Sequence, residues 1–206
     1  MEEKPDFEKD LASIRQMMER SVKFISLSGL AGVMAGVYAL TAATYVYKNF
    51  YEHQLLEARS FIEVRPDQVF HLTVVGIVTL AASLITGVYF SYRKSKRLGF
   101  TFWNNVSKQL FINISIPLVS GGMFVLIMLQ HHYYGLVAPA CLLFYGLALV
   151  NASRNLVEEI RYLGYCELVL GIVASLYIGY GLLFWAIGFG VLHIVYGVLM
   201  YRKYDA

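Results

Sequence analysis

Six long apolar stretches, each nearly free of charge, constrain this chain more than any other feature of its sequence. They cover residues 22–47, 69–92, 110–130, 133–152, 162–180 and 182–201. A helix needs about 20 apolar residues to cross a bilayer, and each stretch is close to that length. Only 15% of the residues are charged, against about 25% in a soluble domain, and the charges gather between the stretches. The sequence therefore predicts an all-α, polytopic membrane protein with six transmembrane helices.

The chain divides into three parts by this pattern. Residues 1–21 are predicted to be a cytoplasmic amphipathic helix, residues 22–201 the transmembrane domain, and residues 202–206 a cytoplasmic tail. Within 6–20 one stripe of the helix is apolar, carried by Phe7, Leu11, Ile14 and Met18. This stripe either lies on the inner leaflet or pairs with a second copy, which makes a homodimer the alternative.

Short connections predict how some helices pair. The breaks between the third and fourth stretches and between the fifth and sixth are very short, so each pair should form a tight antiparallel hairpin. The longer outer loop, residues 48–68, mixes apolar and charged side chains and is expected to form a short interfacial helix that Pro66 ends.

Lysine and arginine favour the cytoplasmic side of a membrane, so their distribution predicts orientation. The N-terminal flank, the second and fourth loops and the C-terminal tail are basic, whereas the third and fifth loops have no Lys or Arg. Both termini should therefore be cytoplasmic. The second loop is expected to contact anionic lipid, and not nucleic acid, through Arg93, Lys94, Lys96 and Arg97.

Two ionisable residues lie inside apolar stretches, on helix faces otherwise built from small residues. Glu167 shares a stripe with Gly164, Gly171, Ser175 and Gly179, and His193 shares one with Ala186, Gly190 and Gly197. Small residues let membrane helices approach closely, so both side chains should face neighbouring helices. If the hairpin turns near Gly181, their depths differ by roughly 3 Å.

We therefore predict a buried polar pair of Glu167 and His193 joined by a hydrogen bond. A retained charge in a bilayer costs about 2.5 to 3.5 kcal/mol on the insertion scale and is often functional. The structural alternatives are that Glu167 reaches the cytoplasmic surface, pairs with a basic loop residue, or only fixes helix packing.

Other polar groups define weaker candidate sites. Ser83, Thr86 and Asn113 fall at a similar inner depth and would line an inner cavity beside a third helix kinked at Pro117. The metal candidates on the outer side are His53, His71, His131 and His132. No spacing among them is a recognised ligand motif, so no metal, haem or other cofactor is predicted.

The segments MMERSVKFISLSGLAGVMAGVYAL and RYLGYCELVLGIVASLYIGYGLLFWAIGFGVLHIVYGVLMYRKY resemble a group of uncharacterised bacterial six-helix inner-membrane proteins. The resemblance covers the first helix and the last two. It implies a location in the bacterial inner membrane and implies no activity. The glycine-rich hairpins are also similar to those of small six-helix acid-stress membrane proteins.

No nucleophile elbow, phosphate-binding loop, zinc-protease motif or dinucleotide fingerprint is present, so we expect a protein that is not an enzyme. The sequence favours a sensor, scaffold or stress-related membrane component that acts through helix packing and partners. One alternative is a small transporter or channel in which Glu167 and His193 relay protons or cations. Another is a metal or haem protein with its site on the outer face.

Overall fold

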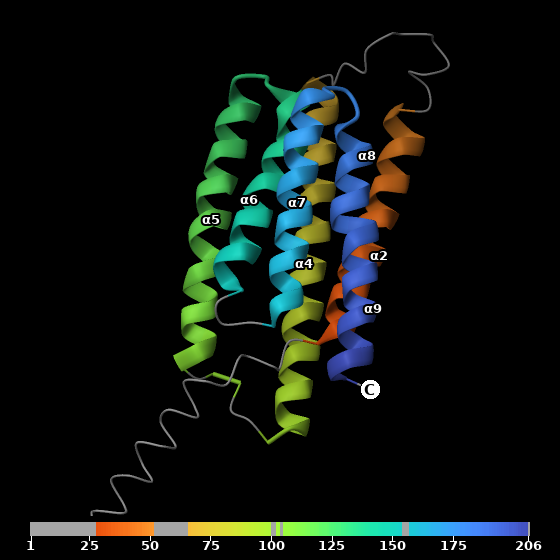
Figure 1. Ribbon diagram of the computed structural model, residues 1–206. Helices are drawn as coiled ribbons and strands as arrows, with labels where there is room; N and C mark the ends of the chain where they lie inside the picture. The colour runs from red at the N-terminus through yellow and green to blue at the C-terminus, as the bar shows by residue number, and fades with distance from the viewer. Residues whose placement is uncertain (1–27, 52–65, 100–101, 104, 154–156, 206) are drawn as a thin grey trace, which may run out of the picture.

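The chain is built from helices that run alternately up and down (Figure 1). We describe a computed structural model, in which residues 28–51, 66–99, 102–103, 105–153 and 157–205 are defined. Within these residues every regular element is a helix, which confirms the all-α class. The predicted amphipathic segment 6–20 and most of the outer loop lie outside the described residues.

Each predicted apolar stretch corresponds to a helix or to a series of helical turns. In chain order these are α2 (Gly29–Val46) with the π-helical turn η1 (Tyr47–Tyr51), α4 (Pro66–Arg97), α5 (Asn105–Gln130), the 3₁₀ turn η2 (Tyr134–Leu136) with α6 (Val137–Ala152), α7 (Glu158–Leu176), and α8 (Gly181–Trp185), η3 (Ala186–Leu192) and α9 (His193–Tyr204). The last three form one continuous rod, which we call the last rod, with a π-helical segment, η3, in its middle.

Five of these helices are long and apolar enough to cross a membrane. The sixth, α7, differs because Glu158, Glu159 and Arg161 occupy its first turn and Glu167 lies in its middle. The remaining residues, 162–176, span about 22 Å at 1.5 Å per residue, less than the roughly 30 Å of a typical hydrocarbon core.

Glycine brings the first helix and the last rod into backbone contact. A Cβ at Gly197 would lie 2.5 Å from the backbone nitrogen of Val33 and 2.8 Å from the carbonyl oxygen of Gly29. A Cβ at Gly32 would lie 3.1 Å from the Cα of Gly197. The predicted small-residue stripe of the last rod therefore packs against glycines of α2, which joins helices from opposite ends of the membrane region.

A second glycine contact joins α6 and α7. A Cβ at Gly164 would lie 3.0 Å from the carbonyl oxygen of Gly146, and one at Gly171 would lie 2.7 Å from Leu143 Cγ. The stripe that carries Glu167 is therefore used mainly against α6. A buried cluster ties the first turns of α7 to its neighbours, and its members are Leu110, Leu149, Ala152, Val157, Ile160, Leu163 and Met200.

The main packing partners of the helices only partly follow their order along the chain. The third and fourth stretches, α5 and α6, do pack closely, but α7 packs most extensively on α6 and the last rod most extensively on α2. The last two helices are joined by a short connection and contact each other, as predicted, but each packs more extensively on another helix because the glycine stripes match other partners. Pro66 is the first residue of α4, a position that suits a residue without a backbone N–H, and the interfacial helix that it was predicted to end lies outside the described residues.

We predict that Gly197→Ala lowers the free energy of unfolding by about 1–3 kcal/mol, because the new methyl group meets backbone atoms that cannot move aside. The measurement is denaturant unfolding of the purified protein in mild detergent. Gly87→Ala on α4 is the matched control, since nothing lies within 4 Å of its Cβ position. Equal stability of the two variants would contradict the backbone contact.

Candidate functional site

The carboxyl group of Glu167 lies in the interior, between α7 and the π-helical segment of the last rod. Its side chain is 0% exposed. A Cβ on Gly188 would lie 2.5 Å from Glu167 Oε2 and equally close to Leu142 Cδ2. The carboxyl group thus rests on the bare Cα of Gly188, and any larger residue there would displace it.

His193 lies at the junction of η3 and α9, with both ring nitrogens engaged. Nδ1 is 2.9 Å from the carbonyl oxygen of Gly188, and Nε2 is 2.7 Å from the hydroxyl of Tyr145 on α6. A carbonyl oxygen only accepts, so Nδ1 carries the proton. In the neutral ring Nε2 then accepts from the tyrosine hydroxyl, which sets the tautomer and the orientation of the imidazole.

Glu167 and His193 are neighbours but are not hydrogen-bonded to each other. Glu167 Oε1 is 3.6 Å from His193 Nδ1, and neither carboxyl oxygen has a hydrogen-bond partner among the described residues. The sequence placed the two side chains at the same depth, and they do meet, but the predicted direct bond is absent because the Gly188 carbonyl already occupies Nδ1. The alternatives in which Glu167 reaches the surface or pairs with a basic loop residue do not fit its complete burial.

The π-helical segment explains why a backbone carbonyl is available to the imidazole. Such wide turns disturb the regular ladder of helical hydrogen bonds and occur frequently at functional sites. Aromatic rings enclose the arrangement: Phe189 stacks on His193 at 5.9 Å between centroids and lies 5.1 Å from Tyr145. Trp185 adds a further ring at 5.4 Å from Phe189.

Three polar side chains therefore follow one another across α6, α9 and α7. They are Tyr145, His193 and Glu167, and we call them the polar cluster. Hydroxyl, imidazole and carboxyl groups can each bind and release a proton, so the chemistry available here is proton binding and transfer. Sequence analysis missed Tyr145, although its position in the middle of the fourth stretch, far from the interfacial ends where tyrosines usually lie, was a usable signal.

The residues proposed to line an inner cavity are not brought together. Ser83 and Thr86 bond to backbone carbonyls one turn earlier in α4, at 2.8 Å and 2.7 Å. The carbonyl of Asn113 in α5 accepts a hydrogen bond from Asn151 in α6 at 2.8 Å. Because α4 packs mainly on α2 and α5 mainly on α6, these residues face different neighbours.

One crevice of about 170 Å³ lies between α5, α6 and α7, away from the polar cluster. Its lining is almost entirely apolar and consists of Phe124, Met128, Leu136, Pro139, Ala140, Leu143, Phe144 and Ser175. The single hydroxyl, that of Ser175, donates to the carbonyl oxygen of Gly171 at 2.9 Å. Neither Glu167 nor His193 contributes to this crevice.

The structure describes three of the four candidate metal ligands, His71, His131 and His132. His53 lies outside the described residues. His71 packs near Phe50 and Phe70, His131 stacks on Tyr133, and Nδ1 of His132 is 2.5 Å from the hydroxyl of Tyr134. In the described part of the chain no three His, Cys, Asp or Glu side chains lie close enough to hold a metal ion together.

The basic residues at the end of α4 do not all face outward. Lys94 is only 5% exposed and forms an ion pair with Asp205, which follows α9. Arg93, Lys96 and Arg97 remain exposed, so lipid contact stays a prediction for these three and does not suit Lys94. The sequence offered little to identify Asp205, a single acid near a basic helix end.

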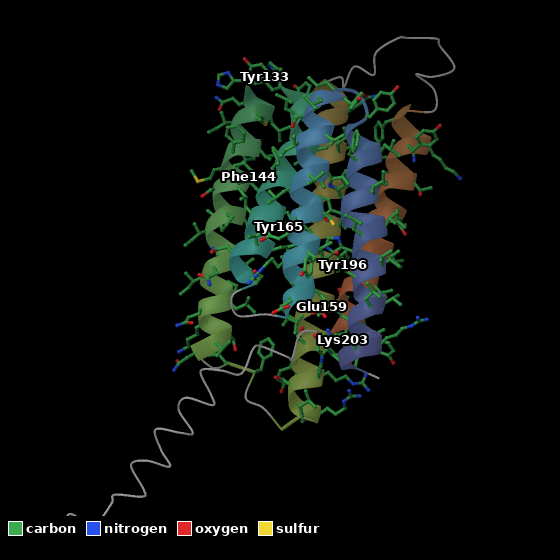
Figure 2. The ribbon with its side chains drawn as sticks, in the orientation of Figure 1. Tyr133, Phe144, Glu159, Tyr165, Tyr196 and Lys203 are labelled. Carbon is green, nitrogen blue, oxygen red and sulfur yellow. The ribbon has the colours of Figure 1, made fainter. Side chains whose placement is uncertain are left out.

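An exposed ion pair at the same end of the molecule provides a contrast with the buried carboxyl. Glu159, at the start of α7, receives hydrogen bonds from Lys203 and Tyr204, and Figure 2 shows Glu159 and Lys203 close together. Desolvation acts to raise the pKa of Glu159, but these hydrogen bonds outweigh it and leave the pKa below its ordinary value. Glu159 therefore offers a matched, accessible carboxylate on the same helix as Glu167.

Comparison of the chain with protein-family models, with curated proteins and with solved structures finds no match. The functional argument therefore rests on the geometry of the polar cluster.

We predict that Tyr145→Phe lowers the free energy of unfolding by about 0.5–1.5 kcal/mol, because His193 loses its partner at Nε2. Unfolding in mild detergent measures the effect, and a double-mutant cycle with His193→Ala should show coupling of at least about 0.5 kcal/mol. Tyr165→Phe is the control, since Tyr165 is an exposed tyrosine on α7 (Figure 2). Additive effects of the two substitutions would show that the contact carries no energy.

Proposed function

We propose that this chain is a non-enzymatic integral membrane protein of the sensor or scaffold class, whose polar cluster responds to protonation. The observation that carries the proposal is the carboxyl group of Glu167, which is fully buried and has no hydrogen-bond partner among the described residues. An ordinary structural carboxylate would be paired or bonded, because an unsatisfied buried polar group costs free energy.

A change of charge in this cluster cannot leave the packing unchanged. A carboxylate in a low-dielectric interior needs a cation or several donors close to it. One such donor, His193 Nδ1, lies 3.6 Å from Glu167 Oε1, but it is held by the carbonyl of Gly188 in the π-helical segment. To bond Glu167, the imidazole must release that carbonyl or η3 must shift. Proton binding is thereby coupled to the conformation of the last rod, which is the property a sensor requires.

The proposed setting is a bacterial inner membrane crossed six times, with both ends of the chain cytoplasmic. Five helices are long and apolar enough to span, and the packing of α7 along α6 supports counting α7 as the sixth span of the proposal. The final turns of α4 and α9 are rich in Lys and Arg, which favours placing that end of the bundle in the cytoplasm. Partners or a second copy would bind the lipid-facing helices or residues 6–20.

We predict that Glu167→Gln weakens the dependence of the unfolding temperature on pH, because the side chain keeps its shape and can no longer bind or release a proton. The measurement is thermal unfolding of the protein in lipid nanodiscs, with hydrogen exchange of residues 186–193 as a local readout. Glu159→Gln alters the exposed ion pair on the same helix. This variant should show the wild-type dependence of the unfolding temperature on pH, except at the low pH at which Glu159 itself titrates. A wild-type profile in Glu167→Gln would refute the sensor proposal.

The second candidate function is a small transporter or channel in which the polar cluster relays protons or cations. The specific observation that favours it is continuity: Tyr145, His193 and Glu167 follow one another at 2.7 Å and 3.6 Å across three helices. A relay also needs access from both faces of the membrane. The complete burial of Glu167 favours the sensor as the first proposal.

Flux separates the two functions. If the protein is a relay, liposomes that contain it should acidify under an imposed pH gradient at a rate that falls at least tenfold in Glu167→Gln. If it is a sensor, wild-type and variant liposomes should both stay at the rate of empty liposomes while the pH dependence of unfolding still differs between them. Glu159→Gln again provides the control for surface charge.

A further inference from the structure

The helix α4 is the least buried of the five candidate spans. It packs mainly on α2, and no residue in its most apolar stretch is buried. Large side chains such as Ile77 and Ile85 are 60% and 70% exposed. The buried residues of α4 lie instead at its ends, and at the basic end they are Ser91, Lys94 and Ser95. The attachment of that end to the bundle therefore depends on a few polar residues.

Asp205 is the centre of this attachment. Its carboxylate accepts hydrogen bonds from the backbone N–H of Gly29 at 2.8 Å and from the hydroxyl of Ser28 at 3.0 Å. The ammonium group of Lys94 lies 2.5 Å from the other carboxylate oxygen. A guanidinium nitrogen of Arg97 also donates to the carbonyl oxygen of Asp205 at 3.3 Å. One acidic residue thus contacts the start of α2, the end of α4 and the end of the last rod.

The chemistry of the contact fits a carboxylate on two grounds. The unpaired N–H groups and the dipole at the start of α2 favour an anion, and the Lys94 ammonium supplies a full positive charge. The two charged side chains are only 5% and 6% exposed. The exposed pair of Lys203 and Glu159 at the same end, with Lys203 62% exposed, has no such seclusion.

We propose that Asp205 is a latch that holds the basic end of α4 against α2 and the last rod, and that its release frees this end of α4. A buried ammonium group is costly without its partner. Loss of Asp205 removes the Lys94 ion pair, the Arg97 hydrogen bond and the two hydrogen bonds from the start of α2 together, so the last turns of α4 lose the contacts that this residue provides to α2 and the last rod. Because α4 has few other buried contacts, release of this end leaves the remaining helices in place.

The test measures access to Ser95, which is 1% exposed beside Lys94. In the full chain, with Cys141 and Cys166 replaced by serine, a cysteine is introduced by Ser95→Cys and its reaction with a water-soluble maleimide is timed in lipid nanodiscs. The latch predicts slow labelling with Asp205 present and labelling at least tenfold faster in Asp205→Asn. Lys94→Met, which removes the buried cation, should also change the rate, whereas Glu159→Gln should leave it unchanged.

A second cysteine distinguishes release of α4 from general unfolding. Ser153, at the corresponding end of α6, is 3% exposed, and Ser153→Cys should label slowly whether or not Asp205 is present. Faster labelling at position 95 alone supports the latch. Equal labelling at position 95 with and without Asp205, or faster labelling at both positions, overturns it.

Discussion

Backbone contact between α2 and the last rod, at Gly29, Gly32 and Gly197, is the constraint on which the other features of the molecule depend. Apolar side chains gain little by leaving lipid for one another, so membrane helices associate through close packing. Glycine allows the two backbones to touch. The contact joins the first and last helices of the membrane region, brings the end of α9 beside the start of α2, and thereby places Asp205 where it can bond Gly29.

The same contact determines the surroundings of Glu167. The last rod is held on one side by α2, and α7 is held on the other by α6 through Gly146 and Gly164. The carboxyl group of Glu167 lies between these two pairs, on the bare backbone of Gly188. In the described part of the chain neither carboxyl oxygen has a hydrogen-bond partner at this seam, and His193 Nδ1 lies 3.6 Å from Oε1.

Several features of the site follow from the sequence because they depend on spacing along one helix. The stripes that contain Glu167 and His193 are visible in the sequence as small residues three and four positions apart. The number of residues from the turn to each side chain shows that Glu167 and His193 lie at similar depths. The Gly188 carbonyl, the Tyr145 hydroxyl and the Asp205 contact do not follow in this way. Each depends on which helix face meets which, and glycine stripes on several helices have more than one plausible partner.

By itself the sequence determined the helical class, the approximate limits of the apolar helices and the inward orientation of Glu167 and His193, because bilayer thickness and helical periodicity act along the chain. Only the tertiary structure decided that α7 packs mainly on α6, that the last rod packs mainly on α2, and that His193 bonds Gly188 and Tyr145 instead of Glu167. The physical reason is that helix partners are selected by the fit of whole faces, and a π-helical segment changes the angle at which side chains leave a helix.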